Sequence, residues 1–187
     1  TGRYLNFETF TLDFAEYLDM KQFFGKKTDQ DMYVEFEEYL LNGGFPKTLE
    51  FDDVQTRQTY TRGIISEIFE KDVKTRKRIS NVPVYERVQS FLLNNYSAPF
   101  SLNNLLECME KEGYKTKATT VRGYIEDLKK AKIVYECNRF DLKSKKSLKR
   151  DQKYYLSDLA IYFAMNTDNR LSVGPSLENI VFLYLAS

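Results

Sequence analysis

Residues 117–137 have the sequence KATTVRGYIEDLKKAKIVYEC, in which the spacing of apolar residues changes from a helical to a strand pattern. The first part carries apolar residues at the spacing of one helix face: Val121, Tyr124, Ile125 and Leu128. From Ile133 onward, apolar and polar residues alternate, as they do in a half-buried strand. The segment therefore predicts a helix followed closely by a strand.

Two further helices are expected before this one. The first follows Pro83 and has an apolar face made by Val84, Val88, Phe91, Leu92 and Tyr96. Ser101 is suited to cap the second, and Gly113 stands where a left-handed residue ends a helix. A Lys-rich loop then leads from the strand at Ile133 to a second strand at Lys153–Leu156. Three helices closed by a two-stranded ribbon are typical of a winged helix-turn-helix domain.

The amino-terminal part predicts a short strand over residues 4–10 and three helices. One holds Phe14, one begins at Asp31 and ends at the segment Asn42-Gly43-Gly44-Phe45-Pro46, and one runs from about Asp53 to Arg78. We therefore expect a mainly α chain with a small β-hairpin. Its parts are a helical unit over 1–80, a winged helix-turn-helix domain over 81–158, and a linker helix with the start of a further domain over 159–187.

Composition excludes several kinds of chemistry. The 187 residues include no His, which removes imidazole bases and histidine metal ligands, and two Cys are too few for a four-thiolate zinc site. The sequence Gly25-Lys26-Lys27-Thr28 lacks the first Gly and the Lys-Ser/Thr order of a phosphate loop. Acid-x-Lys triplets are a weak signal without a second carboxylate on a neighbouring strand. We expect no enzyme activity in this segment, no metal, and no cofactor.

The cellular setting is also an expectation from composition. No apolar run approaches the roughly 20 residues of a membrane span, and no apolar leader with a small-residue cleavage site opens the chain. Cys108 and Cys137 suit buried thiols in a reducing compartment. We expect a cytoplasmic protein with no membrane partner.

Charge is distributed unevenly along the chain. Residues 1–54 hold 5 basic and 12 acidic groups, whereas residues 111–153 hold 14 basic and 6 acidic groups, although the whole chain has a net charge of only +1. A local basic region of this kind favours contact with nucleic acid. The alternative is a solvated loop whose lysines only keep the protein soluble.

Duplex DNA is accordingly one expected partner. Lys117, Thr119, Thr120 and Arg122 would face the groove, because the third helix of such a domain presents its first residues to the bases. The ribbon would contact phosphates through a larger basic set: Lys143, Lys145, Lys146, Lys149 and Arg150. Winged helices also serve as protein-docking or assembly modules, so a protein partner is the alternative.

Several segments together resemble a known family. They are residues 1–4 (TGRY), 12–18 (LDFAEYL), 36–46 (FEEYLLNGGFP), 121–128 (VRGYIEDL), 153–158 (KYYLSD) and 177–182 (LENIVF). The resemblance is to bacterial and archaeal AAA-type ATPases that carry a carboxy-terminal nuclease-like domain of unknown function. It covers nearly the whole chain.

The resemblance implies that the chain holds the last core strand, a helical lid and the winged helix of such an ATPase. The parts that bind ATP and magnesium would lie outside it. Arg3 would occupy a position that can supply an arginine finger, although a simple surface Arg is the alternative. Glu178 would match an acidic position in the first helix of the nuclease-like domain. Apolar residues of this last helix would favour self-association: Ile180, Val181, Leu183 and Tyr184.

Overall fold

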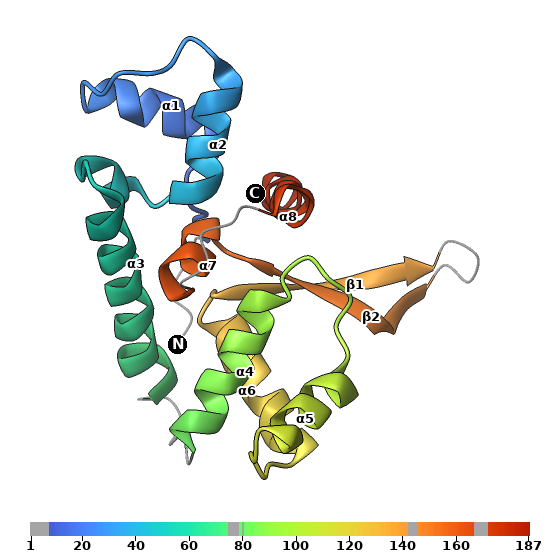
Figure 1. The fold of residues 1–187 in the computed structure, drawn as a ribbon. Helices are drawn as coiled ribbons and strands as arrows, with labels where there is room; N and C mark the ends of the chain where they lie inside the picture. Colours follow the sequence, from blue (N-terminus) through green and yellow to red (C-terminus); the bar gives the residue numbers. More distant parts are fainter. Residues whose placement is uncertain (1–7, 75–78, 80, 142–145, 167–171) are drawn as a thin grey trace, which may run out of the picture.

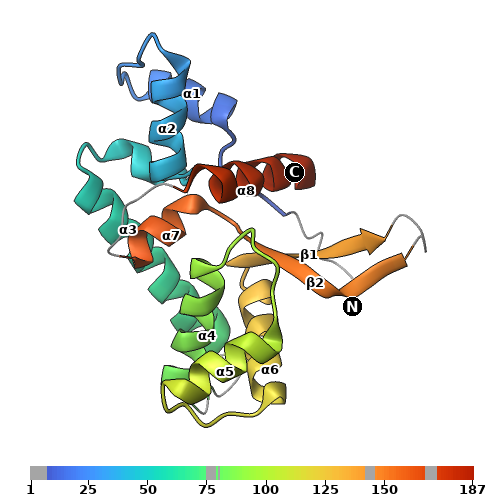
Figure 2. The same ribbon diagram turned by 45° about the vertical axis from the view of Figure 1, so that its right-hand side comes forward.

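The structure, a computed structural model, describes residues 8–74, 79, 81–141, 146–166 and 172–187. The described part is mainly helical, with one two-stranded antiparallel sheet (Figure 1), which confirms the expected fold class. The helices form two groups, and the sheet projects beyond the second group as a long hairpin (Figures 1 and 2).

In the first group, the three α-helices are capped by aspartates. The group contains α1 (Phe14–Phe23), α2 (Met32–Asn42), the short 3₁₀ helix η1 (Pro46–Glu50), α3 (Val54–Ile68) and the π-helical turn η2 (Phe69–Lys74). The side chains of Asp13, Asp31 and Asp53 each accept a backbone N–H in the first turn of the helix that follows. The predicted helix from Asp53 therefore begins where expected, but its last described turn is π-helical.

The predicted strand over 4–10 is wrong in its described part. Residues 8–10 have no regular secondary structure, and the remainder lies outside the described residues. This segment is held by side chains rather than by a backbone ladder. The Glu8 carboxylate accepts from Lys132 Nζ at 2.6 Å and from the Tyr135 hydroxyl at 3.1 Å, and Phe10 stacks on the Tyr135 ring.

The second group contains α4 (Val82–Asn94), α5 (Leu102–Lys111) and α6 (Ala118–Lys130). Ser101 Oγ accepts the N–H of Asn104, which confirms Ser101 as the cap of α5. Gly113 has a φ of 87°, so the left-handed turn that separates α5 from α6 also falls where the sequence predicts it.

The hairpin is longer than the sequence indicates. Strand β1 (Val134–Asp141) pairs antiparallel with β2 (Lys146–Leu156), from Val134 opposite Leu156 to Asp141 opposite Lys146. The register slips between Cys137 and Arg139, where residues 149–152 of β2 bulge opposite the single residue Asn138. The expected Lys-rich loop is thus largely strand, and the prediction of a loop over Lys146, Lys149 and Arg150 is wrong.

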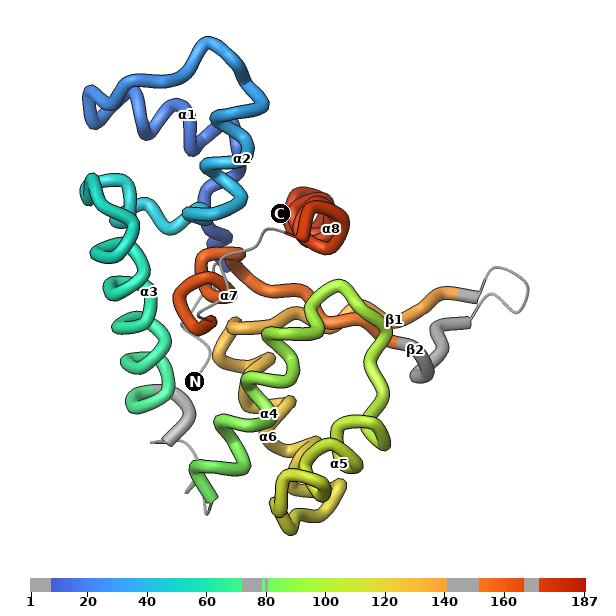
Figure 3. The backbone as a smooth tube through the Cα atoms, in the orientation of Figure 1, coloured from blue at the N-terminus to red at the C-terminus, as the bar shows by residue number. Residues whose placement is uncertain are grey.

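Helix α7 (Leu159–Met165) joins the two groups. It packs against α2 and α3 on one side and against α4 on the other, as the backbone trace in Figure 3 shows. A single apolar cluster consequently includes Leu40 of α2, Ile65 of α3, Val88 of α4 and Phe163 of α7. Helix α8 (Val173–Ala186) follows and packs against β2; in Figure 1 it is seen end-on while the hairpin runs across the view.

A pair of glycines fixes the end of α2 against the start of α7. The side chain of Asp158 is buried and accepts the N–H groups of Gly44 and Ala160, both at 2.8 Å. Gly43 has a φ of 72°, and a Cβ atom built on it would lie 1.8 Å from Asp158 Oδ1. The Gly-Gly segment is therefore more than a helix stop, because it lets the backbone approach a buried carboxylate.

A buried ionic cluster holds α1 against α2. Lys21, whose side chain is 5% exposed, donates to Glu35 at 2.6 Å and to Glu38 at 2.9 Å. Glu38 also contacts the Arg57 guanidinium of α3 at 3.4 Å. Part of the acidic charge of the amino-terminal third is therefore neutralised inside the fold.

Candidate nucleic-acid interface

Helix α6 presents one apolar and one polar face. Its apolar residues Val121, Tyr124, Ile125 and Leu128 are buried in the main cluster, as their spacing predicts. The four residues expected to face a groove lie at its amino-terminal end. Lys117, Thr119 and Arg122 are exposed, and Thr120 is half-buried.

Two of these residues, Lys117 and Arg122, carry a positive charge that a binding partner could contact. Among the described residues, neither Lys117 nor Arg122 has a salt-bridge partner. Lys117 also occupies the N-cap position without making a side-chain cap bond. The positive end of the helix dipole therefore coincides with two cationic side chains, an arrangement that favours a nearby anion such as a phosphate.

The expected ribbon residues belong to the far part of the hairpin. Lys146, Lys149 and Arg150 are in β2, with Lys149 and Arg150 in the bulge, while Lys143 and Lys145 lie outside the described residues. The 11 residues of β2 extend for about 36 Å at the usual rise of a strand. The structure thus places the backbone of Lys146, Lys149 and Arg150 along the projecting hairpin and not on α6.

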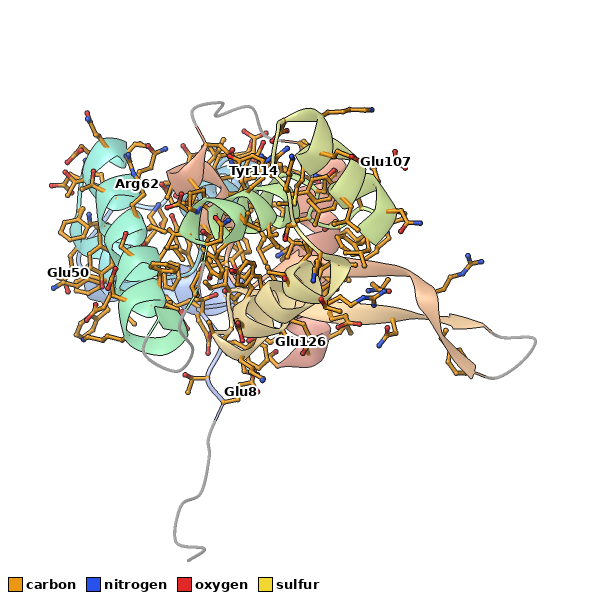
Figure 4. All side chains as sticks on the ribbon, turned by 90° about the horizontal axis from the view of Figure 1, so that it is seen from below. Glu8, Glu50, Arg62, Glu107, Tyr114 and Glu126 are labelled. Atoms are coloured by element: carbon orange, nitrogen blue, oxygen red, sulfur yellow. The ribbon has the colours of Figure 1, made fainter. Side chains whose placement is uncertain are left out.

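Three other lysines of the basic region are paired with acids. Lys129 contacts Glu126 and Glu136, Lys132 contacts Glu8, and Lys153 contacts Glu178 at 2.6 Å. Glu8 and Glu126 both lie on the side of the molecule seen in Figure 4, near the end of α6. These pairs reduce the free positive charge at the base of the hairpin below the value that the sequence implies.

Helix α8 packs on β2 near the helices through hydrogen bonds and an aromatic stack. The Asn179 amide accepts the N–H of Leu156 at 2.7 Å and donates to its carbonyl oxygen at 3.0 Å. Phe182 stacks on Tyr155 with ring centroids 4.1 Å apart. Burial raises the pKa of Glu178, but hydrogen bonds from Lys153 and Tyr155 outweigh it and hold that pKa below its ordinary value.

The sequence did not reveal this role of α8. Glu178 and Asn179 stand in a helical pattern, and nothing local indicates that they reach β2. The expected arginine finger, Arg3, lies outside the described residues.

Two further observations concern the described residues alone. No helix among them is both long and apolar enough to cross a membrane. In the same ranges, no group of three or more Cys, Asp or Glu side chains is placed to hold a metal ion.

Two curated relatives align with the chain along almost its full length. An uncharacterized protein of Haemophilus influenzae is 26% identical over 186 residues, covering 99% of this chain and 46% of the relative. The uncharacterized protein MJ1544 of Methanocaldococcus jannaschii is 25% identical over 189 residues, covering 98% of this chain and 42% of the relative. The chain thus spans less than half the length of these relatives.

No solved structure matches the chain. The sequence pattern of a family described as "Domain of unknown function (DUF8612)" matches residues 33–172, which is more than half of the chain. The matched range extends from α2 to just before α8 and so includes α6, the hairpin and the Gly43–Asp158 contact. The chain therefore belongs to the DUF8612 family.

Proposed function

We propose that residues 81–158 form a winged helix-turn-helix domain that contacts duplex DNA. The order of α4, α5, α6 and the hairpin supports this assignment. So does the segment between α4 and α5, where Ser97 N donates to Tyr154 O and Phe100 N donates to Gln152 O. Through these bonds residues 97–100 pair with β2 in a single antiparallel bridge. The pairing holds the hairpin beside the three helices.

One observation carries the proposed DNA contact. Exposed Lys117 and Arg122 lie without salt-bridge partners, among the described residues, at the positive end of α6. In this proposal α6 enters the groove, and the hairpin lysines neutralise phosphates of the adjacent backbone. Because the basic residues of the hairpin would contact phosphate rather than bases, binding depends strongly on salt and weakly on sequence.

The same proposal gives the chain a place in a larger protein. It is the lid and winged-helix portion of an AAA-type ATPase, and it carries no catalytic step of its own. ATP and magnesium would then bind sequence outside these 187 residues. The length of the two relatives, each more than twice that of the aligned segment, leaves room for such a part.

A titration of labelled duplex DNA at about 50 mM and about 200 mM salt tests the DNA contact. If about four phosphates are neutralised, the slope of log K against log salt is about −3.6, and affinity falls about 150-fold over this range. Reversing the charge of Lys145 and Lys146 to Glu flattens the slope by about two units. Arg122→Ala weakens binding to a preferred sequence by about 1–3 kcal/mol.

A matched control separates local contact from total charge. Lys27→Glu with Lys47→Glu changes the same net charge on the first helical group, so it leaves DNA affinity nearly unchanged if the interface is local. Equal losses from the two double variants would show that only net charge matters. Absence of binding by the wild type at the lower salt concentration would refute the DNA contact.

A protein-docking role is the second candidate, and the outer face of α8 favours it. Val181, Tyr184 and Leu185 have 55%, 68% and 77% of their surfaces exposed, although each is apolar or aromatic. A second copy of the chain would cover this face. Analytical ultracentrifugation should then show a dimer that Tyr184→Ser with Leu185→Ser converts to monomer, while a monomer at every concentration would exclude self-association.

A further inference from the structure

The outward face of α6 holds two residues that contact with phosphate does not explain, Gly123 and Glu126. Thr119, Arg122 and Glu126 are exposed and occupy positions i, i+3 and i+7 of one helix face. Gly123 stands between Arg122 and Glu126 along this face. A carboxylate repels phosphate, and a glycine has no side chain with which to contact it. Both residues therefore need a different role where this face meets DNA.

Gly123 has neither a conformational nor a packing reason inside the fold. It lies within α6, it is not one of the glycines with a positive φ, and a Cβ atom built on it would meet no described atom within 4 Å. Glycine within a helix weakens that helix relative to alanine. The missing side chain instead lets another molecule approach the backbone of α6 closely.

The Glu126 carboxylate is oriented through one of its two oxygens. Glu126 Oε1 accepts from Lys129 Nζ at 2.8 Å, and Lys129 also contacts Glu136 of β1. The other oxygen, Oε2, makes no hydrogen bond to a described residue, and 52% of the side chain is exposed. Arg122, four residues earlier, has no salt-bridge partner among the described residues. An oriented acceptor and an unpaired guanidinium therefore lie about one helical turn apart.

Base edges in the major groove suit these two side chains differently. An arginine guanidinium pairs with the O6 and N7 acceptors of guanine. A carboxylate can only accept, so it fits the N4 amino group of cytosine; adenine also offers an amino group, but the N7 acceptor beside it repels a carboxylate. At a rise of about 1.5 Å per residue, Arg122 and Glu126 are about 6 Å apart along the helix axis, or about two base steps.

We propose, on the basis of the DNA contact proposed above, that Arg122, Gly123 and Glu126 form a base-reading face of α6. This face selects a guanine and a cytosine within about two base pairs of each other. Arg122 contacts the guanine, Glu126 Oε2 accepts from the cytosine N4 amino group, and Gly123 lets the base edges approach the helix. The sequence preference is confined to these two base pairs, within an interface that otherwise binds phosphate.

Selection from a pool of randomised duplexes tests this base reading on the full chain. The wild type should enrich duplexes that share a G and a C at a fixed spacing. On a selected duplex, replacing the C·G pair by T·A should weaken binding about 5- to 150-fold, as measured by fluorescence anisotropy. Glu126→Gln should change the preference at this position from cytosine to adenine, because a glutamine amide pairs with adenine N6 and N7. The same substitution at exposed Glu107 on α5 (Figure 4) should leave the preference for cytosine unchanged.

A second variant tests the close approach at Gly123. Gly123→Leu adds a side chain in open space and replaces glycine by a better helix former, so it should raise the melting temperature. It should nevertheless remove the preference for the selected duplex. Gly63→Leu on α3 makes the same change at an exposed glycine outside the domain, and it should leave that preference intact.

The outcomes separate the base reading from the DNA contact itself. If the wild type binds every duplex of the pool equally, the DNA contact stands and the base reading is refuted. If Glu126→Gln keeps the wild-type preference for cytosine, the carboxylate does not read that base and the assignment is wrong. If no duplex binds at about 50 mM salt, the DNA contact and the base reading are both refuted.

Discussion

Replacing Gly43 by Ala should strongly destabilise the protein, because two separate costs meet at this position. The backbone has a φ of 72° and a ψ of −170°, a conformation that almost only glycine adopts and that costs a residue with a side chain about 1–3 kcal/mol. The added Cβ would also lie 1.8 Å from Asp158 Oδ1 and 2.7 Å from the Ala160 Cβ. The Asp158 carboxylate must therefore move away from the N–H groups of Gly44 and Ala160.

The second cost is the larger one. A hydrogen bond to a charged, buried group contributes about 1.5–3 kcal/mol, and Asp158 accepts two from backbone N–H groups. Partial loss of both, added to the backbone strain, lowers the free energy of unfolding by about 3–6 kcal/mol. That is a large fraction of the roughly 5–15 kcal/mol that stabilises a folded protein.

Two other glycines provide matched controls for this substitution. Gly25 also has a positive φ, 65°, but a Cβ atom added there would meet nothing within 4 Å, so Gly25→Ala should lose only the backbone term of about 1–2 kcal/mol. Gly63 lies within α3 in open space, so Gly63→Ala should gain about 0.5–1 kcal/mol.

Urea unfolding followed by far-ultraviolet circular dichroism measures all three variants. The expected order of stability is Gly63→Ala above wild type, then Gly25→Ala, then Gly43→Ala. If Gly43→Ala is within about 0.5 kcal/mol of Gly25→Ala, the close approach of Asp158 contributes nothing and the reasoning is wrong.

Three further predictions concern buried polar groups. Lys21→Met should lower the free energy of unfolding by about 3–5 kcal/mol, because Glu35 would be left charged and buried; Lys21→Arg should cost less in the same urea assay. Burial raises the pKa of Asp158 to about 6, so this group stabilises the fold increasingly as pH falls from about 6 to about 4. Relative to wild type, Asp158→Asn should therefore lose about 2 kcal/mol more at about pH 4.5 than at about pH 7, and an equal deficit at both values would contradict the shift. Asn179→Leu should cost about 2–4 kcal/mol by leaving the N–H and C=O of Leu156 unpaired, whereas Asn94→Leu on the exposed side of α4 should be nearly neutral.

Local signals in the sequence predicted the helices well. Asp31 and Ser101 cap α2 and α5, and Gly113 has its left-handed conformation, because capping and turn chemistry depend on residues only a few positions apart. The apolar face of α6 is likewise determined by residues within one helix. These features require no knowledge of the tertiary structure.

The missed features depend on distant residues. Lys153 pairs with Glu178, 25 positions away, and Lys132 pairs with Glu8, 124 positions away, so a charge count over residues 111–153 overstates the free basic charge. The extension of β2 was missed because a Lys-rich segment has low intrinsic strand preference, and pairing with β1 overrides it. The sequence predicts a helix stop at Gly43 and Gly44, but the hydrogen bond from Gly44 to Asp158 spans 114 positions.

The position of α7 in the chain has a consequence for protein synthesis. Helices α2 and α3 complete their packing against Leu159–Met165, about 100 residues later in the sequence. At about 5–20 residues per second, a ribosome needs about 5–20 s to make that intervening stretch. During this interval the apolar side chains of α2 and α3 that pack on α7 lack that cover. A nascent chain arrested before residue 159 should therefore bind chaperones and be digested readily by protease, whereas release of the longer chain should protect both helices together.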